Sequence, residues 1–279
     1  MFQPVVKWSG SKRSQAERIV SYFPVEIGTY YEPFCGGCSV MRQVAETETI
    51  HVERYFCSDL NSHLIDLWVD IKNHPDSLYK EYTEFWKELN KDEDIERRKE
   101  YFNIVRENFN KASCKESGTF LFLLRTCMNG MPRYNSKGEF NTSLHFTRPG
   151  IQPEKLKDIL GEWSGLLNEK NVEFNCCSYG EIKPGKDDFL YLDPPYFNTK
   201  GMYSGGLDFE KFFEWLGNLS CKWGLSFDGK VEGKKDYTVE LPKALYNRHI
   251  YIESGNSSFR RLKLKDKNNK VFESLYLNF

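Results

Sequence analysis

Short apolar runs recur along the chain, and longer segments with a helical period of hydrophobic residues lie between them. Such a run, bounded by Gly, Pro, Asn or Asp, is typical of a β-strand. We predict strands at 29–34, 55–59, 188–193, 222–227, 249–254 and 271–279. We predict helices at 14–23, 64–72 and 208–219. The alternation of the two element types indicates an α/β fold.

Residues 73–161 interrupt this rhythm. A polar segment with a helical period covers 77–109 and is expected to break near Asn90, and the apolar segment 119–128 follows it. Between 129 and 150 the chain is rich in Gly, Pro and Asn, which predicts an irregular loop.

The two patterns divide the chain into two parts. We predict a strand-rich domain formed by 1–72 and 162–279, and a mainly helical inserted domain at 73–161. The chain has 279 residues, of which 39% are hydrophobic, so it can bury the core of one large domain that carries an insertion.

Nothing in the sequence indicates export or membrane insertion. No apolar run approaches the roughly 18 residues that a membrane helix needs, and the first residues lack the apolar core of a leader peptide. The eight cysteines are irregularly spaced and do not form a small disulfide framework. We therefore expect a globular, cytoplasmic protein with no membrane partner.

The formal net charge of -1 gives no overall attraction to nucleic acid, so any such binding needs local asymmetry. Two segments have a local excess of positively charged residues. Residues 222–279 contain 12 Lys and Arg against 7 Asp and Glu, and residues 119–150 contain 4 against 1. These segments are candidate nucleic-acid surfaces, with ordinary solvated charge as the alternative.

The stretch Cys35-Gly-Gly-Cys38 follows the first predicted strand and allows two interpretations. In a doubly wound sheet this turn presents backbone N–H groups to a cofactor, and an acidic residue about 20 positions later holds ribose hydroxyls. Asp59 lies 23 residues after Gly36 and fits that spacing. A metal or redox pair is the alternative, although a structural zinc site commonly needs two close ligand pairs and only one is present.

A second feature, Asp193-Pro194-Pro195-Tyr196, ends the apolar strand predicted at 188–193. Two consecutive prolines stiffen the turn and remove N–H donors. The Asp193 carboxylate and the Pro194 carbonyl both accept hydrogen bonds, which suits an exocyclic amino group, and Tyr196 can stack on the ring that carries it. The alternative is a strand terminator with a capping Asp.

These and four further motifs resemble the DNA adenine methyltransferase (Dam) family of amino-methyltransferases, in the family's order and almost from end to end. The matching stretches are KWSGSK (7–12), EPFCGGCSV (32–40), SDLNSHLIDLW (58–68), NGMPRYNSKGEFN (129–141), YLDPPY (191–196) and ESLYLNF (273–279). The resemblance implies a doubly wound, mostly parallel sheet of the Rossmann-like methyltransferase type with a mainly helical inserted target-recognition domain. It also favours the cofactor turn over a metal or redox pair.

The resemblance further implies that S-adenosylmethionine is the cofactor. Its expected ligands are Trp8, Lys12, Phe34, Gly36, Asp59 and Asp193. Asp59 is expected to hold the ribose, and Asp193 is expected to lie between the cofactor and the target base.

The chain departs from the family pattern at four places. Ser11 and Cys38 stand where the family has glycines; both are small, so we expect altered affinity and retained binding. The stretch 143–150 replaces the Pro-x-Gly that often follows Phe-Asn, and 196–209 is shorter than in many relatives. The last difference affects the segment expected to enclose the target base.

Methyl transfer to an amino nitrogen needs alignment and stabilisation of the charge that develops on nitrogen, and it needs no covalent intermediate. We expect Asp193, Pro194 and Tyr196 to be the catalytic residues. The target atom lies inside a duplex, so the base has to be flipped out and captured by stacking.

Double-stranded DNA is the expected partner, with no obligatory protein partner evident. Arg133 can make a bidentate contact to guanine, and Asn129 and Asn135 can pair with adenine edges. Arg125 and Lys137 are expected to contact phosphates. Arg260 and Arg261 suit the DNA backbone. Construction of the loop is the alternative role for the two asparagines and for Arg133, and solvated loop charge is the alternative for Arg260 and Arg261.

The resemblance implies a bacterial or phage-encoded, site-specific adenine methyltransferase, and the similarity of residues 129–135 points to a GATC-like target. A cytosine amino-methyltransferase and an RNA adenine methyltransferase use the same chemistry and are alternatives. A DNA-binding module without catalysis is the third.

Overall fold

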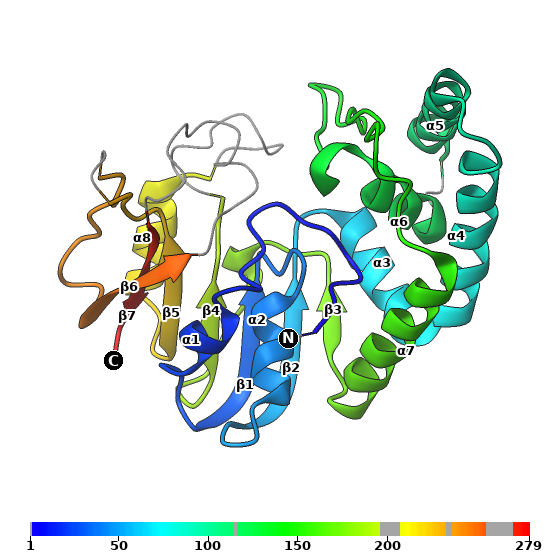
Figure 1. Cartoon of the computed structure of the whole chain (residues 1–279). Helices are drawn as coiled ribbons and strands as arrows, with labels where there is room; N and C mark the ends of the chain where they lie inside the picture. The colour runs from blue at the N-terminus through cyan, green and yellow to red at the C-terminus, as the bar shows by residue number, and fades with distance from the viewer. Residues whose placement is uncertain (1, 114–115, 196–206, 233–235, 255–269) are drawn as a thin grey trace. The chain divides into compact units, whose positions relative to one another are not determined.

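The computed structural model describes residues 2–113, 116–195, 207–232, 236–254 and 270–279. Its sheet has seven strands in the order β3-β2-β1-β4-β5-β7-β6 (Figure 1). The strands are β1 (Glu26–Pro33), β2 (His51–Ser58), β3 (Glu173–Asn175), β4 (Phe189–Leu192), β5 (Lys222–Phe227), β6 (Arg248–Ser254) and β7 (Val271–Leu277). The six predicted strands are all present, which confirms the α/β class. β3 was not predicted, because three residues are too few to show an alternating pattern.

The sheet is mixed. β1 pairs in parallel with β2 and β4, and β4 pairs in parallel with β5, whereas β7 is antiparallel to both β5 and β6. From β1 the chain moves to β2 on one side, and β4 later pairs on the other side. The order therefore reverses at β1, and open α/β sheets bind ligands at the carboxyl ends of the strands at such a point.

β4 is the central strand of the sheet. All four residues of β4 are buried, as expected for a strand with neighbours on both edges and cover on both faces. Leu190 and Leu192 belong to a hydrophobic cluster with Phe212 and Leu216 of helix α8 (Phe209–Gly217). This packing holds the end of β4, where Asp193 follows, in a defined place.

Contacts divide the chain into two compact units. The helical unit comprises Met1–Ser11 and Asn61–Cys176, and the sheet unit comprises Lys12–Leu60 and Cys177–Phe279. Besides α8, the sheet unit contains α1 (Ala16–Val20) and α2 (Ser39–Glu46), of which α2 was not predicted.

The helical unit is organised around one buried helix. Its helices are α3 (Ser62–Asn73), α4 (Pro75–Leu89), α5 (Ile95–Lys111), α6 (Ser117–Thr126) and α7 (Pro153–Glu169). Every residue of α6 is buried, and α6 packs against α3, α4 and α5 (Figure 1). A helix that is buried on all sides forms the core of its unit.

This unit is larger than the predicted insertion 73–161. Helix α3 packs on α6 and α7, and α7 packs on α4, so α3 and the last turns of α7 join the other helices. The division into a catalytic and a target-recognition domain is a functional one and stays a prediction. Within the described residues, no helix is both long and apolar enough to cross a bilayer.

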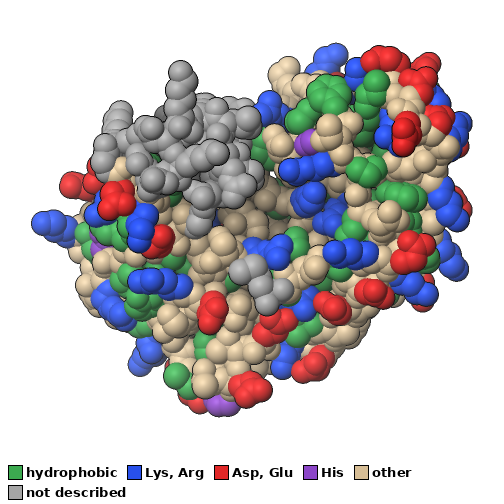
Figure 2. Space-filling view, in the orientation of Figure 1, with side chains coloured by type: hydrophobic (Ala, Val, Ile, Leu, Met, Phe, Trp, Pro, Cys, Tyr) green, Lys and Arg blue, Asp and Glu red, His purple; other side chains and the backbone are tan. Residues whose placement is uncertain are grey.

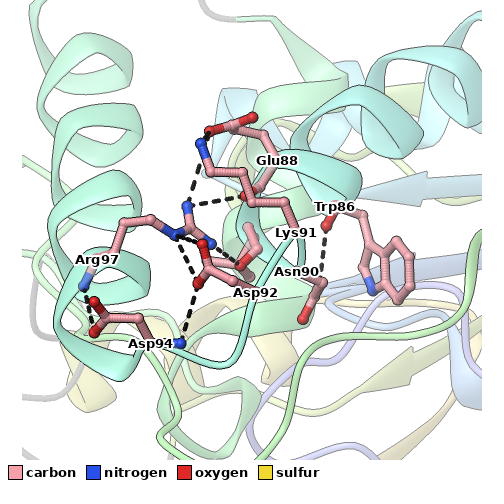
Figure 3. A network of polar contacts seen from close by, with 8 residues as sticks. Trp86, Glu88, Asn90, Lys91, Asp92, Asp94 and Arg97 are labelled. Carbon is pink, nitrogen blue, oxygen red and sulfur yellow. Dashed lines mark hydrogen bonds and ion pairs between the residues drawn. The ribbon is translucent and has the colours of Figure 1, made fainter.

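The predicted break near Asn90 is present between α4 and α5 (Figure 3). The Asn90 amide donates to the Trp86 carbonyl at the end of α4. Arg97 donates to the carbonyls of Glu88 and Leu89, which satisfies acceptors that a helix C-terminus leaves open. Asp94 caps α5 by accepting from the N–H groups of Glu96 and Arg97.

We expect Asp94→Ala to lower the free energy of unfolding by about 1 kcal/mol, because it removes the acceptor for two N–H groups at the start of α5. Denaturant titration followed by circular dichroism measures the change. Glu93→Ala is the matched control, since Glu93 is an exposed carboxylate one residue away, and it should change the value by less than about 0.5 kcal/mol. Equal effects of the two substitutions would contradict the capping role.

Candidate active site

A tight turn joins β1 to α2. Phe34, Gly36 and Cys38 all have positive φ, at 66°, 47° and 49°, and the Cys38 N–H donates to the Cys35 carbonyl at 2.7 Å. Left-handed residues reverse the chain within a few positions, and they are uncommon for residues other than glycine. Cys38 stands where the family pattern has a glycine, and its left-handed conformation costs about 1–2 kcal/mol.

The two cysteines of this turn and Cys57 of the neighbouring strand β2 are buried and protonated. Cys35, Cys38 and Cys57 are each no more than 3% exposed. Burial raises the pKa of the Cys35 thiol to about 12, and it raises the pKa of Cys38 and Cys57 as well. Thiolates are the reactive and metal-binding form, so these thiols act as small apolar residues. The described part of the chain contains no group of three or more side chains suited to a metal ion.

An acidic residue lies against the turn. Asp59 follows the last residue of β2, and its Oδ2 accepts from the Gly36 N–H at 3.2 Å. β1 and β2 are parallel, with Pro33 opposite Ser58, so the two strands end at the same level. The structure therefore brings Gly36 and Asp59 together, as the sequence spacing predicts.

An aromatic cluster flanks the turn on the same unit. Phe34 stacks on Tyr179 with ring centroids 5.6 Å apart, and Tyr179 packs edge-on against Phe212 and Trp215. Tyr179 begins the short helix η2 (Tyr179–Glu181), which a capping box between Ser178 and Glu181 fixes. Sequence reasoning missed Tyr179; the Ser-x-x-Glu pattern of the capping box is the signal that marks this turn.

Asp193 and Lys12 form an ion pair at the end of β4. The Lys12 Nζ lies 2.7 Å from the Asp193 Oδ2, and the Lys12 side chain is only 3% exposed. Burial raises the pKa of the Asp193 carboxyl to about 6, and the Lys12 ammonium opposes that rise. Two residues predicted separately as cofactor ligands are thus direct partners. Pro194 follows Asp193 and is buried.

A second acidic side chain lies close to this pair. Glu32 is buried on β1, and the Tyr30 hydroxyl donates to its Oε2 at 2.6 Å. Burial raises the pKa of Glu32 to about 8, with a further rise from Asp193 and an opposing effect of Tyr30 and Lys12. Sequence reasoning did not select Glu32, although Glu-Pro-Phe is part of the matched motif.

The predicted DNA contacts that the structure describes belong to the helical unit and differ in accessibility. Arg133 and Lys137 are exposed on the loop after α6. The Asn135 Oδ1 accepts from the N–H groups of Lys137 and Glu139, so Asn135 builds this turn. Asn129 is half-buried and left-handed, at φ 58°.

Arg125 does not fit the phosphate contact that the sequence predicts. Its side chain is buried, and its Nη1 donates to the Pro4 carbonyl at 3.0 Å and to the Val5 carbonyl at 3.4 Å. The guanidinium therefore secures the N-terminal segment on the helical unit. Arg125 is buried because it lies on α6, a helix that is covered on all sides.

A further cation of the helical unit was missed. Burial and the nearby Arg125 and Arg148 lower the pKa of Lys7, and Gly130 lies so close that a Cβ there would meet the Lys7 side chain. Figure 2 shows Lys and Arg side chains gathered on the visible face of this unit. Trp8, a predicted cofactor ligand, follows Lys7 and is half-buried. Tyr196, Arg260 and Arg261 lie outside the described residues.

The sheet unit combines three elements at the carboxyl ends of neighbouring parallel strands: a left-handed turn after β1, an acid after β2, and Asp-Pro-Pro after β4. This combination is typical of α/β proteins that bind a nucleotide-like ligand at the carboxyl ends of their strands.

Residues 8–270 match the family of D12 class N6 adenine-specific DNA methyltransferases, and the chain belongs to this family. It is 34% identical to a type II methyltransferase of Methanocaldococcus jannaschii over 70% of this chain and 69% of that protein. It is 31% identical to a DNA adenine methylase of Vibrio cholerae over 68% of this chain and 64% of that protein. A DNA N-6-adenine-methyltransferase of Escherichia phage P1 is 30% identical, over 72% of this chain and 26% of the phage protein.

The burial of the cysteines predicts how they react with a maleimide at neutral pH. Cys176 is exposed and should be labelled within minutes, whereas Cys35, Cys38 and Cys57 should be protected until the chain unfolds. Mass spectrometry of peptides from folded and denatured protein measures the labelling of each thiol. Rapid labelling of Cys35 or Cys38 in the folded protein would show an accessible thiolate and would restore the redox or metal interpretation.

Proposed function

We propose that this adenine-specific methyltransferase transfers a methyl group from S-adenosylmethionine to the exocyclic amino nitrogen of an adenine flipped out of duplex DNA. The observation that carries the proposal is the Asp193 carboxylate, held by Lys12 at the end of a fully buried strand and next in the sheet to the turn after β1. This arrangement provides a fixed acceptor beside a cofactor turn.

The residues of the sheet unit fit the proposed cofactor. The Asp59 carboxylate has the acceptors that ribose hydroxyls need, and the Phe34 and Tyr179 rings offer faces for the adenine. Gly36 provides backbone at the turn without a side chain, and Lys12 completes the set that the sheet unit contributes. Trp8 belongs to the helical unit and stays a predicted cofactor ligand. When bound, the cofactor supplies an activated methyl group on a sulfonium.

Asp193 and the Pro194 carbonyl accept hydrogen bonds from the amino group and stabilise the positive charge that develops on nitrogen. This role requires the ionised carboxylate. With a pKa of about 6, Asp193 is mostly ionised at neutral pH and becomes protonated as the pH falls through that value. Activity is therefore expected above about pH 6 and is lost below it.

Tyr196 is proposed to stack on the flipped base, which offsets part of the few kcal/mol that unstacking costs. Arg133 is proposed to read a guanine edge, and Lys137 to contact phosphate, because both side chains are exposed on the loop after α6. Asn129 remains a proposed base contact. Arg260 and Arg261 are proposed to contact the DNA backbone.

Asp193→Ala should lower the rate of methyl transfer at least about 100-fold while duplex affinity changes only a few-fold, because the carboxylate acts on the amino group. Tritium transfer from labelled cofactor gives the rate, and a binding isotherm at fixed salt gives the affinity. Asp187→Ala, an exposed carboxylate just before β4, is the matched control and should keep near-normal activity. More than about a tenth of normal turnover in Asp193→Ala would disprove the assigned role.

Arg133→Ala should cost about 1–3 kcal/mol on the cognate site and much less on a site already altered at the contacted base pair. Methylation rates on duplexes substituted at each position, for both proteins, test this, after the cognate site has been mapped in modified DNA. Lys137→Ala on the same loop is the comparison, since a lost phosphate contact weakens all sequences equally and lowers the salt slope by about one. An equal loss on every duplex for Arg133→Ala would exclude direct readout.

A further inference from the structure

Lys12 lies between two carboxylates. Its Nζ is 2.7 Å from the Asp193 Oδ2 and 3.5 Å from the Glu273 Oε2. The Lys12 side chain is 3% exposed, and each carboxylate is 19% exposed, so solvent screens these charges only weakly. Glu273 is far from the other two in sequence; it begins the matched stretch 273–279, to which no role in the reaction was assigned.

The sheet fixes the position of Glu273. β7 pairs on one edge with β5 and on the other with β6, where Ile252 lies opposite Glu273. The chain also approaches closely at Gly229, where a Cβ would collide with the Phe272 carbonyl and the Glu273 Cα. A side chain on such a rigid strand holds its partner in a defined place.

Among the described residues, the titratable groups that interact with Asp193 come from four segments of the chain. Lys12 precedes α1, Glu32 lies on β1, Tyr191 on β4, and Glu273 on β7. Burial and Glu273 raise the pKa of Asp193, and Lys12 lowers it. The second carboxylate therefore opposes the effect of the ammonium on the first.

We propose that Glu273 is a positioning residue for methyl transfer, which shares the Lys12 ammonium with Asp193 and so keeps Asp193 a strong hydrogen-bond acceptor. The proposal rests on the proposed role of Asp193. If the Lys12 ammonium interacted with Asp193 alone, the Asp193 carboxylate would be less basic and would accept a hydrogen bond from an amino group more weakly. Glu273 thus acts on the reaction through Lys12.

The test is the pH profile of methyl transfer in Glu273→Gln, measured with saturating duplex and cofactor. The acid limb is the part of the profile in which the rate of methyl transfer falls as the pH is lowered. Removal of the negative charge of Glu273 should move this limb to lower pH by roughly 0.5–1 unit, and the rate on the plateau above it should fall several-fold. Glu273→Asp keeps the charge and should keep the limb close to its normal position. Duplex affinity should not change in either variant.

Glu253→Gln is the matched control. Glu253 lies on the neighbouring strand β6 and pairs with the exposed Lys270 at 3.3 Å, so the substitution makes the same charge change away from Lys12. It should leave both the limb and the plateau unchanged. An equal shift of the limb in Glu253→Gln would reduce the effect to overall charge and overturn the proposal.

An unmoved acid limb in Glu273→Gln, or a chain that no longer shows cooperative unfolding, would overturn the proposal and assign Glu273 a structural role. Asp193→Ala separates this from failure of the proposed function. If Asp193→Ala is inactive and Glu273→Gln keeps the normal limb, only the role of Glu273 fails. If Asp193→Ala is active, the proposed role of Asp193 is wrong, and the role of Glu273 that depends on it is wrong as well.

Discussion

A carboxylate at the end of a buried strand loses most of its hydration, and the Lys12 ammonium is what allows Asp193 to be charged there at neutral pH. Burial alone would favour the protonated acid, which accepts hydrogen bonds more weakly than the carboxylate. An unpaired ammonium at 3% exposure would be equally costly. Each charge is therefore tolerated because the other is present, and the site depends on this pair.

The sheet order brings the other parts of the site to the same edge. β4 pairs with β1, and β1 with β2, so the residues that follow these strands meet at the carboxyl ends although they are far apart in sequence. The turn after β1 reverses tightly through left-handed residues, of which Phe34 and Cys38 are not glycine. Such strain is maintained only where the surrounding structure fixes it, and it concentrates at functional sites.

In the helical unit, similar residue types serve different purposes. Arg125 and Asn135 satisfy backbone groups of their own unit, whereas Arg133 and Lys137 extend into solvent. A guanidinium that is buried inside its own unit is not accessible to a phosphate. The exposed pair is therefore better placed for the proposed DNA contacts, whereas Arg125 holds the N-terminal segment and Asn135 builds its turn.

The sequence by itself determined the α/β class, six of the seven strands and the break at Asn90, because alternation, helical period and turn residues are local properties. It also determined the family, through motifs whose order along the chain is visible without a structure. It could not show that Arg125 is buried or that Asn135 builds its turn, because arginine and asparagine look the same in a sequence whether they face water or backbone.

Only the tertiary structure decided which charges are neighbours. Lys12, Asp193 and Glu273 are separated by most of the chain, and no periodicity links them. The pKa of a carboxyl depends on burial and on charges within a few ångströms, and both follow from strand order. The chemistry of the local motif Asp-Pro-Pro-Tyr therefore depends on Lys12 and Glu273. These two residues lie near opposite ends of the chain, and the fold brings them together at Asp193.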